Sequence, residues 1–171
     1  MEQYMNKPVP TNREIPFPEN SVIVSKTNPK GVITYCNEIF IEMSGYSEEE
    51  LLGQPHSLLR HPQMPGAVFK LLWDTIQKKE EINAYVINLT KNGDFYWVFG
   101  NVTPSFDEKN NIIGYFSVRR KPDPDKLAII KNVYTQMLSI EKSQGMEASL
   151  QYLQNIVNEK GVTYEEFILT F

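Results

Sequence analysis

Cysteine is nearly absent from this sequence, since Cys36 is the one cysteine in it. Histidine is also rare, with two residues. One cysteine cannot form an intramolecular disulfide or supply a cysteine-only metal cage. No run of residues approaches the roughly 18 apolar positions of a membrane span. The opening residues 1–4 have no basic segment followed by an apolar run, so they do not predict a secretory signal. We therefore expect a cytoplasmic protein without direct membrane insertion.

Clustered basic charge and catalytic signatures are also missing. The net charge is −4, whereas nucleic acids and anionic membranes favour clustered Lys and Arg. The sequence has no G-x-S-x-G motif, no H-E-x-x-H motif and no glycine loop suited to phosphate. We therefore expect a protein that is not an enzyme and has no nucleic-acid partner.

The length and hydrophobic content of the sequence predict one domain with an appendage. Hydrophobic residues make up 41% of the 171 positions, which is enough for a sizeable core. Residues 1–19 contain four prolines and few aliphatic residues, which predicts an irregular N-terminal arm. We expect the main domain over residues 20–122 and a helical C-terminal extension over residues 123–171.

Alternating apolar positions and turn residues predict five strands in the main domain. These cover residues 21–25, 31–36, 82–90, 95–104 and 112–120. Hairpins join the neighbours within each group, so the sheet is antiparallel and the fold class is α+β. Helices inserted between the second and third strands would cover one face of the sheet and leave a cavity beneath them.

The inserted helices carry clear local signals. Asn37 can cap a helix over residues 38–43, and Ser47 begins an S-x-x-E capping box for a second short helix. A longer helix is predicted over residues 65–79 because apolar residues recur at helical spacing. Downstream, three helices are predicted in the tail. Their apolar stripe spans too few heptads for a coiled coil, so the tail can seal the sheet, pair with a second copy or contact a receptor.

This order of elements resembles the PAS sensory domain. The resemblance rests on T-Y-C-N-E-I-F at residues 34–40 and S-G-Y-S-E-E-E-L-L-G at residues 44–53. A narrower resemblance, carried by R-H-P-Q-M-P at residues 60–65 and K-N-G-D-F-Y-W-V at residues 91–98, is to the Aer/CetB energy-taxis sensors. It implies a flavin, FAD, held in the PAS cavity. It also implies signalling to a separate membrane-bound chemoreceptor, which would associate the protein with a membrane indirectly.

Residue chemistry and this resemblance together suggest a binding site. Arg60 and His61 lie in a loop stiffened by prolines and can donate to a flavin edge or a pyrophosphate. Trp73 can stack near the flavin ring or simply pack in the core. Strand amides such as Asn88 and Asn101 need hydrogen-bond partners, which a flavin edge or the backbone can provide. The candidate cofactor-binding residues are Asn37, Arg60, His61, Met64, Trp73, Asn88, Trp97 and Asn101.

Some of these assignments have alternatives. Asn37 is also suited to a helix cap. The strand face that carries Trp97 and Asn101 either lines the cavity or packs against another element. Cys36 lies outside the N-C-R-F-L-Q helix that forms cysteine–flavin adducts in light-sensing PAS domains, so we expect no adduct.

Two other functions compete with flavin sensing. His56 or His61 could bind haem in a gas sensor. A cofactor-free interaction adaptor is the other alternative, and a homodimer is compatible with each. The adaptor is supported by three departures from the family pattern, where an acidic residue, a tryptophan and an arginine are replaced by Gln63, Ile82 and Leu89.

Overall fold

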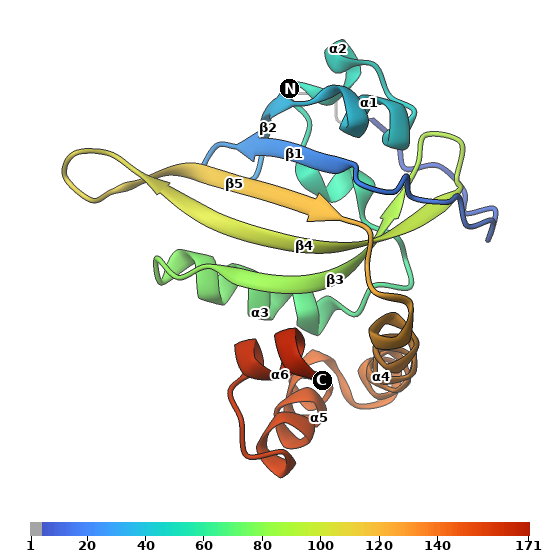
Figure 1. The fold of residues 1–171 in the computed structure, drawn as a ribbon, viewed down its shortest axis with the longest axis vertical. Helices are drawn as coiled ribbons and strands as arrows, with labels where there is room; N and C mark the ends of the chain where they lie inside the picture. The colour runs from blue at the N-terminus through green and yellow to red at the C-terminus, as the bar shows by residue number, and fades with distance from the viewer. Residues whose placement is uncertain (1–4) are drawn as a thin grey trace.

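The computed structural model describes residues 5–171, so the first four residues of the predicted arm lie outside the described residues. Its centre is a five-stranded antiparallel sheet in the order β2-β1-β5-β4-β3 (Figure 1). The strands are β1 (Val22–Thr27), β2 (Ile33–Cys36), β3 (Ile82–Leu89), β4 (Phe95–Phe106) and β5 (Ile112–Arg120). The predicted α+β fold is confirmed, and each strand boundary lies close to its predicted position.

Helices between β2 and β3 cover one face of the sheet. They are α1 (Glu38–Ser44), α2 (Glu48–Leu51), the 3-10 helix η1 (His56–Leu59) and α3 (Gly66–Gln77). Asn37 caps α1, since its Oδ1 accepts from the Phe40 amide at 3.2 Å. Gly45 ends this helix at φ 75°, a left-handed conformation that favours glycine. The predicted capping box of Ser47 is present in α2.

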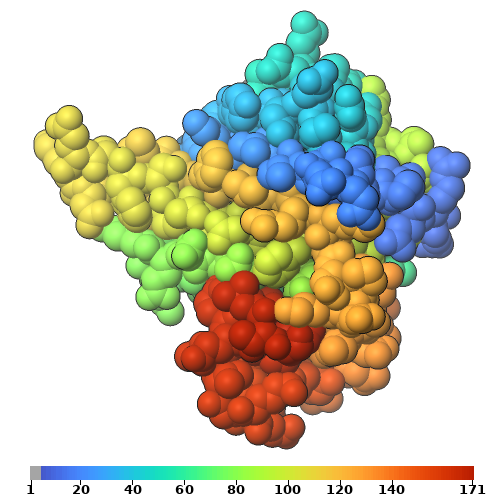
Figure 2. Space-filling view, viewed as in Figure 1, coloured from blue at the N-terminus to red at the C-terminus, as the bar shows by residue number. Residues whose placement is uncertain are grey.

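The C-terminal extension forms three helices beneath β3 and α3 (Figures 1 and 2). They are α4 (Pro124–Gln144), α5 (Met146–Glu159) and α6 (Tyr164–Thr170). Their apolar side packs on the β3–β4 hairpin: the Trp97 and Tyr134 ring centroids lie 6.0 Å apart, and Tyr85 lies near Phe171. The aromatic face of β4 is therefore packed by another element.

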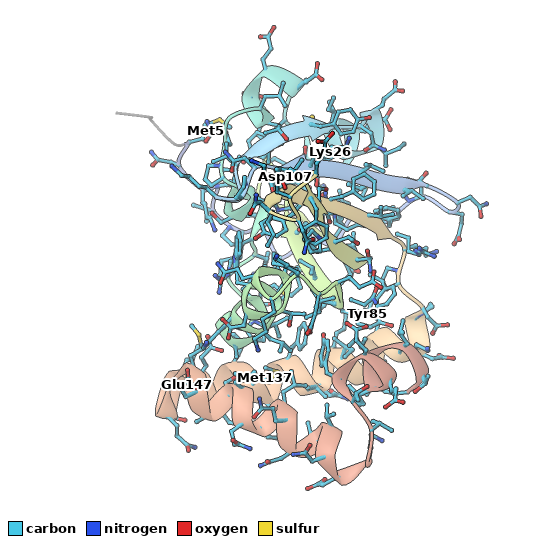
Figure 3. All side chains as sticks on the ribbon, turned by 90° about the vertical axis from the view of Figure 1, so that its left-hand side faces the viewer. Met5, Lys26, Tyr85, Asp107, Met137 and Glu147 are labelled. Atoms are coloured by element: carbon cyan, nitrogen blue, oxygen red, sulfur yellow. The ribbon has the colours of Figure 1, made fainter. Side chains whose placement is uncertain are left out.

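The tail also covers the exposed edge of the sheet. β3 is an edge strand, and such strands leave backbone groups unpaired unless another element covers them. The Tyr134 hydroxyl donates to the Tyr85 carbonyl at 2.7 Å, and the Tyr164 hydroxyl donates to the Asn83 carbonyl at 2.9 Å. Figure 3 shows Tyr85 directly above the tail helices. The sheet edge and the tail are thus joined by directional hydrogen bonds as well as apolar packing.

The described part of the arm crosses the turn between β3 and β4. The Thr11 amide donates to the Gly93 carbonyl at 2.9 Å, and the Phe95 amide donates to the Arg13 carbonyl at 3.0 Å. The Arg13 guanidinium forms an ion pair with the buried side chain of Asp94. The arm therefore packs on the core domain, although residues 5–13 contain neither helix nor strand.

We expect replacement of Tyr134 by phenylalanine to destabilise the protein. The variant keeps the buried ring but leaves the Tyr85 carbonyl without its edge-side donor, which costs about 1–3 kcal/mol. Urea unfolding followed by circular dichroism measures the loss. Tyr35→Phe is the control, because Tyr35 is 44% exposed and should change stability by less than about 0.5 kcal/mol. Equal stability of the two variants would contradict the role given to this hydrogen bond.

Candidate functional site

A cavity of about 480 Å³ lies between the sheet and the helices η1 and α3. This volume lies within the range of about 300–1,000 Å³ that is usual for small-molecule sites. Alternate residues of β1, β3 and β5 form one wall, and Phe69 and Trp73 of α3 form part of the opposite wall. Trp73 meets Tyr115 edge to face, with ring centroids 5.6 Å apart. Such apolar walls suit a flat ligand.

Arg119 of β5 carries a buried positive charge at the sheet wall of this cavity. Its exposed fraction is only 3%, and its guanidinium lies 4.7 Å from the centre of the Phe40 ring. One nitrogen donates to Ser25 Oγ, whereas Nε and Nη1 have no hydrogen-bond partner. Burial lowers the pKa of Arg119 to about 10, so the group remains charged at neutral pH. Among residues 5–171, no carboxylate forms an ion pair with it.

Asn88 of β3 places a second unpaired donor at the cavity wall. The residue is 2% exposed, and its Nδ2 has no hydrogen-bond partner. A buried donor without a partner costs about 1–3 kcal/mol, so such groups call for an explanation. Together with Arg119, Asn88 gives the cavity buried donors that an acceptor-rich ligand would satisfy.

Behind the lining, Tyr96 lies opposite Asn88 in the β3–β4 ladder. It is fully buried, and burial raises its pKa to about 12, opposed by the charge of Arg119 and by the Asn88 side-chain amide next to its hydroxyl. At neutral pH the phenol is therefore protonated. It adds another polar group to this part of the interior without adding negative charge that could neutralise Arg119.

His56 completes the polar side of the cavity. Its Nε2 lies 3.4 Å from Ser25 Oγ, and its ring stacks on Phe40 with centroids 6.0 Å apart. Burial, together with the positive charge of Arg119, lowers the pKa of His56 to about 3. The imidazole is therefore neutral at physiological pH and adds no charge to the site.

The charged residues that line the cavity are basic, namely Lys30, Arg60, Lys70 and Arg119, and none of the described lining residues is acidic. Part of this charge is offset, because Lys70 pairs with Asp74 and Glu141 lies near Arg60. The positive charge that remains attracts anions into the cavity. An anionic ligand, or a neutral ring that carries a phosphate, matches it best.

The structure brings together three of the predicted site residues, Arg60, Trp73 and Asn88, which all line the cavity. Asn37 instead caps α1 and donates to the Val22 carbonyl at 2.9 Å, so it acts as a helix cap. His61 is buried behind the cavity wall, where its ring lies 5.3 Å from Phe95.

Three of the predicted site residues, Met64, Trp97 and Asn101, do not line the cavity. Successive strand residues point to opposite faces, and the residues of β4 that line the cavity are Gly100 and Val102. Trp97 and Asn101 therefore point away from the cavity, toward the face that the tail partly covers. Met64 packs in the apolar cluster that the tail shares with α3. Asn101 Nδ2 donates to Asn83 Oδ1 at 3.2 Å, so its amide already has a partner within the sheet.

Sequence reasoning missed Arg119 and underrated His56. The signal for Arg119 was present, because strand alternation puts it on the same face as Tyr115 and Ser117, which is the face toward the helices. A charged residue on an inward strand face indicates either a salt bridge or a ligand. Of the two histidines considered for haem, only His56 lines the cavity.

The three departures from the family pattern lie outside the cavity lining. Gln63 is exposed, and Leu89 is buried but does not line the cavity. Ile82 packs beside Ile76 and Tyr115 at one end of it. Cys36 is also buried outside the lining. The substitutions therefore leave the unpaired donors and the aromatic walls of the cavity unchanged.

An antiparallel sheet with helices on one face and a ligand-sized cavity between them defines a sensory domain of the PAS type. Comparison with known families agrees, since the family described as PAS fold matches residues 33–119. The chain belongs to this family.

Relatives with known names are sensors and regulators. The chain is 38% identical over 127 residues to the aerotaxis receptor of Escherichia coli K12, covering 74% of this chain and 25% of the receptor. It is 30% identical over 100 residues to a nitrogen fixation regulatory protein of Klebsiella pneumoniae, covering 58% of this chain and 20% of that protein. The chain thus spans a quarter or less of these curated relatives.

Solved structures show the same fold. The light-state structure of the blue-light photoreceptor Aureochrome1 LOV has a TM-score of 0.57 at 23% identity, over 65% of this chain and 88% of that chain. A light-oxygen-voltage domain studied with a flavin analogue has a TM-score of 0.56 at 25% identity, over 67% and 87%. Within the described part of the present chain, no helix has the length and apolar character needed to cross a membrane.

We expect stability to fall as the pH is lowered from 7 to 5.5. The pKa of His56 is lower in the folded protein than in the unfolded chain, so below pH 6.5 the unfolded state binds more protons. This difference removes about 1 kcal/mol of stability over that interval. Urea unfolding at the two pH values should show a smaller change for His56→Gln than for the wild type. An undiminished pH dependence in this variant would contradict the assignment.

Proposed function

We propose that this chain is a PAS redox or energy-taxis sensor that binds a flavin, FAD, in its cavity. The observation that supports this most strongly is a pair of buried groups in the cavity wall: the guanidinium of Arg119, in which two nitrogens have no partner, and the amide of Asn88. A flavin edge offers carbonyl and ring-nitrogen acceptors to such donors. The remaining walls provide apolar and aromatic surface for the tricyclic ring.

The aromatic and basic residues at the cavity match two parts of FAD, the flavin ring and the pyrophosphate. Trp73 would contact the ring, Arg119 and Asn88 would bind its polar edge, and Arg60 would face the pyrophosphate. When bound, a flavin supplies reversible electron transfer, with a change of charge at N1 and N5. The chain's own contribution is to keep a fixed positive charge beside that edge and to exclude water from it.

The proposed role of the domain is signalling, without catalysis. The names of its relatives support this, since they include an aerotaxis receptor and a regulatory protein. We propose that the partner is a separate membrane-bound chemoreceptor and that the protein works in the cytoplasm beside it. A change in ligand charge can shift a protein between two states only if the ligand interacts differently with each.

An absorption spectrum of the freshly purified protein tests the proposal. A flavin gives a band near about 450 nm that is lost on reduction. A Soret band near about 400–430 nm would instead identify haem, and His56→Ala should then abolish or shift it. A colourless protein that stays colourless after incubation with FAD but still binds a receptor would be the cofactor-free adaptor. Either of these results would contradict flavin sensing.

Two asparagines on opposite faces of the sheet provide a matched test of the site. Asn88→Ala should weaken FAD binding about 3- to 10-fold, because it removes one buried hydrogen bond to the ligand. Asn101→Ala should leave FAD affinity unchanged, since Asn101 lies outside the cavity lining. Titration of flavin fluorescence measures both affinities. Weaker binding in Asn101→Ala alone would mean that the ligand lies on the other face.

A further inference from the structure

Three side chains from distant parts of the chain converge on Gly66, the first residue of α3. Arg60 follows η1, Glu141 lies in the last turn of α4, and Met146 begins α5. A methyl group built on Gly66 would lie 2.6 Å from Glu141 Oε1, 2.9 Å from Met146 Cε and 3.3 Å from Arg60 Nη2. The convergence therefore depends on a residue without a side chain at this position.

Glu141 attaches the tail to the helix that forms a wall of the cavity. Its Oε1 accepts from the Gly66 amide at 2.8 Å, and its Oε2 accepts from the Ala67 amide at 3.3 Å. The first amides of a helix have no partner within the helix, and a carboxylate there also interacts favourably with the helix dipole. One side chain of α4 thus caps α3 across 75 positions of sequence.

The same corner of the tail reaches the ligand cavity. Both Arg60 and Met146 line the cavity, and the Arg60 guanidinium lies 4.3 Å from the centre of the Phe69 ring. Burial lowers the pKa of Arg60, and the negative charge of Glu141 opposes this shift. Arg60 therefore lies between the Glu141 carboxylate of the tail and the cavity.

We propose that Glu141 is a ligand-sensitive latch: an anionic group bound in the cavity at Arg60 competes with Glu141 and loosens the α4–α5 corner, residues 141–149. The proposal rests on the flavin function above, with the pyrophosphate of FAD as the anion. A second anion beside Arg60 repels the Glu141 carboxylate. It also weakens the attraction between Glu141 and the positive charge of Arg60. Coupling between two sites is reciprocal, so removing the charge of Glu141 must strengthen the binding of the anion.

Two flavins and two variants separate this proposal from simple packing. Glu141→Gln keeps an oxygen for the α3 amides but removes the negative charge. It should bind FAD about 5-fold more tightly than the wild type. Riboflavin, which has the ring but no phosphate, should bind both proteins equally. Glu159→Gln is the matched control, since it removes an acidic group from the exposed far end of α5 and should change neither affinity.

Hydrogen exchange of the corner is the second readout. FAD, but not riboflavin, should speed exchange of residues 141–149 in the wild type. Gly66→Ala should speed it without any ligand, because the added methyl group displaces Glu141 and Met146. Unchanged or weaker FAD binding by Glu141→Gln, or FAD slowing the exchange, would overturn the latch.

The two proposals fail in different ways. If the wild type binds neither flavin, the proposed function fails and with it the ligand that would operate the latch. Hydrogen exchange of ligand-free Gly66→Ala then decides whether the contacts at Gly66 stabilise residues 141–149. If the wild type binds both flavins but Glu141→Gln binds FAD no more tightly than the wild type does, the flavin site is supported and the latch is wrong.

Discussion

The two faces of the β3–β4 hairpin divide the molecule between ligand and tail. Because side chains alternate along a strand, every second residue of β3 faces the cavity, and the residues between face the tail helices. Asn88 and Val86 lie on the first face, and Tyr85 lies on the second. No residue of this hairpin can change face without a shift of register, so the cavity and the tail are fixed relative to each other. The helix α3 also contacts both, since Phe69 and Trp73 line the cavity and Ala67 and Val68 pack in the cluster that contains the tail.

The cavity wall also contains an unusual buried charge, that of Arg119. Ordinarily a buried arginine is paired with a carboxylate, since an isolated charge is costly to remove from water. Here the ring of Phe40 and the hydroxyl of Ser25 support Arg119, and two of its nitrogens have no partner. Such an arrangement costs stability unless a further acceptor reaches these nitrogens.

Local signals in the sequence were sufficient for the fold. Asn37 and the capping box of Ser47 act over a few residues, and the structure confirms the helices that they delimit. The site was harder to predict, because which face of a strand looks inward depends on helices far away in the sequence. For this reason the sequence left two placements open for the face of Trp97 and Asn101, and the structure shows the one away from the cavity, whereas Arg60, Trp73 and Asn88 line it.

The hydrogen bonds between Glu141 and the start of α3 also bear on the order of events during synthesis. Residues of the sheet and of α3 leave the ribosome well before α4 and α5, and chains fold from the N-terminal end as they emerge. The cavity rim at Gly66 and Met146 is complete only when residues some 75 to 80 positions later have joined it. A ligand that needs this rim can be held in its final environment only after α4 and the start of α5 have been made. Completion of the cavity rim is therefore a late step, at which residues 141–146 complete a site begun at Gly66.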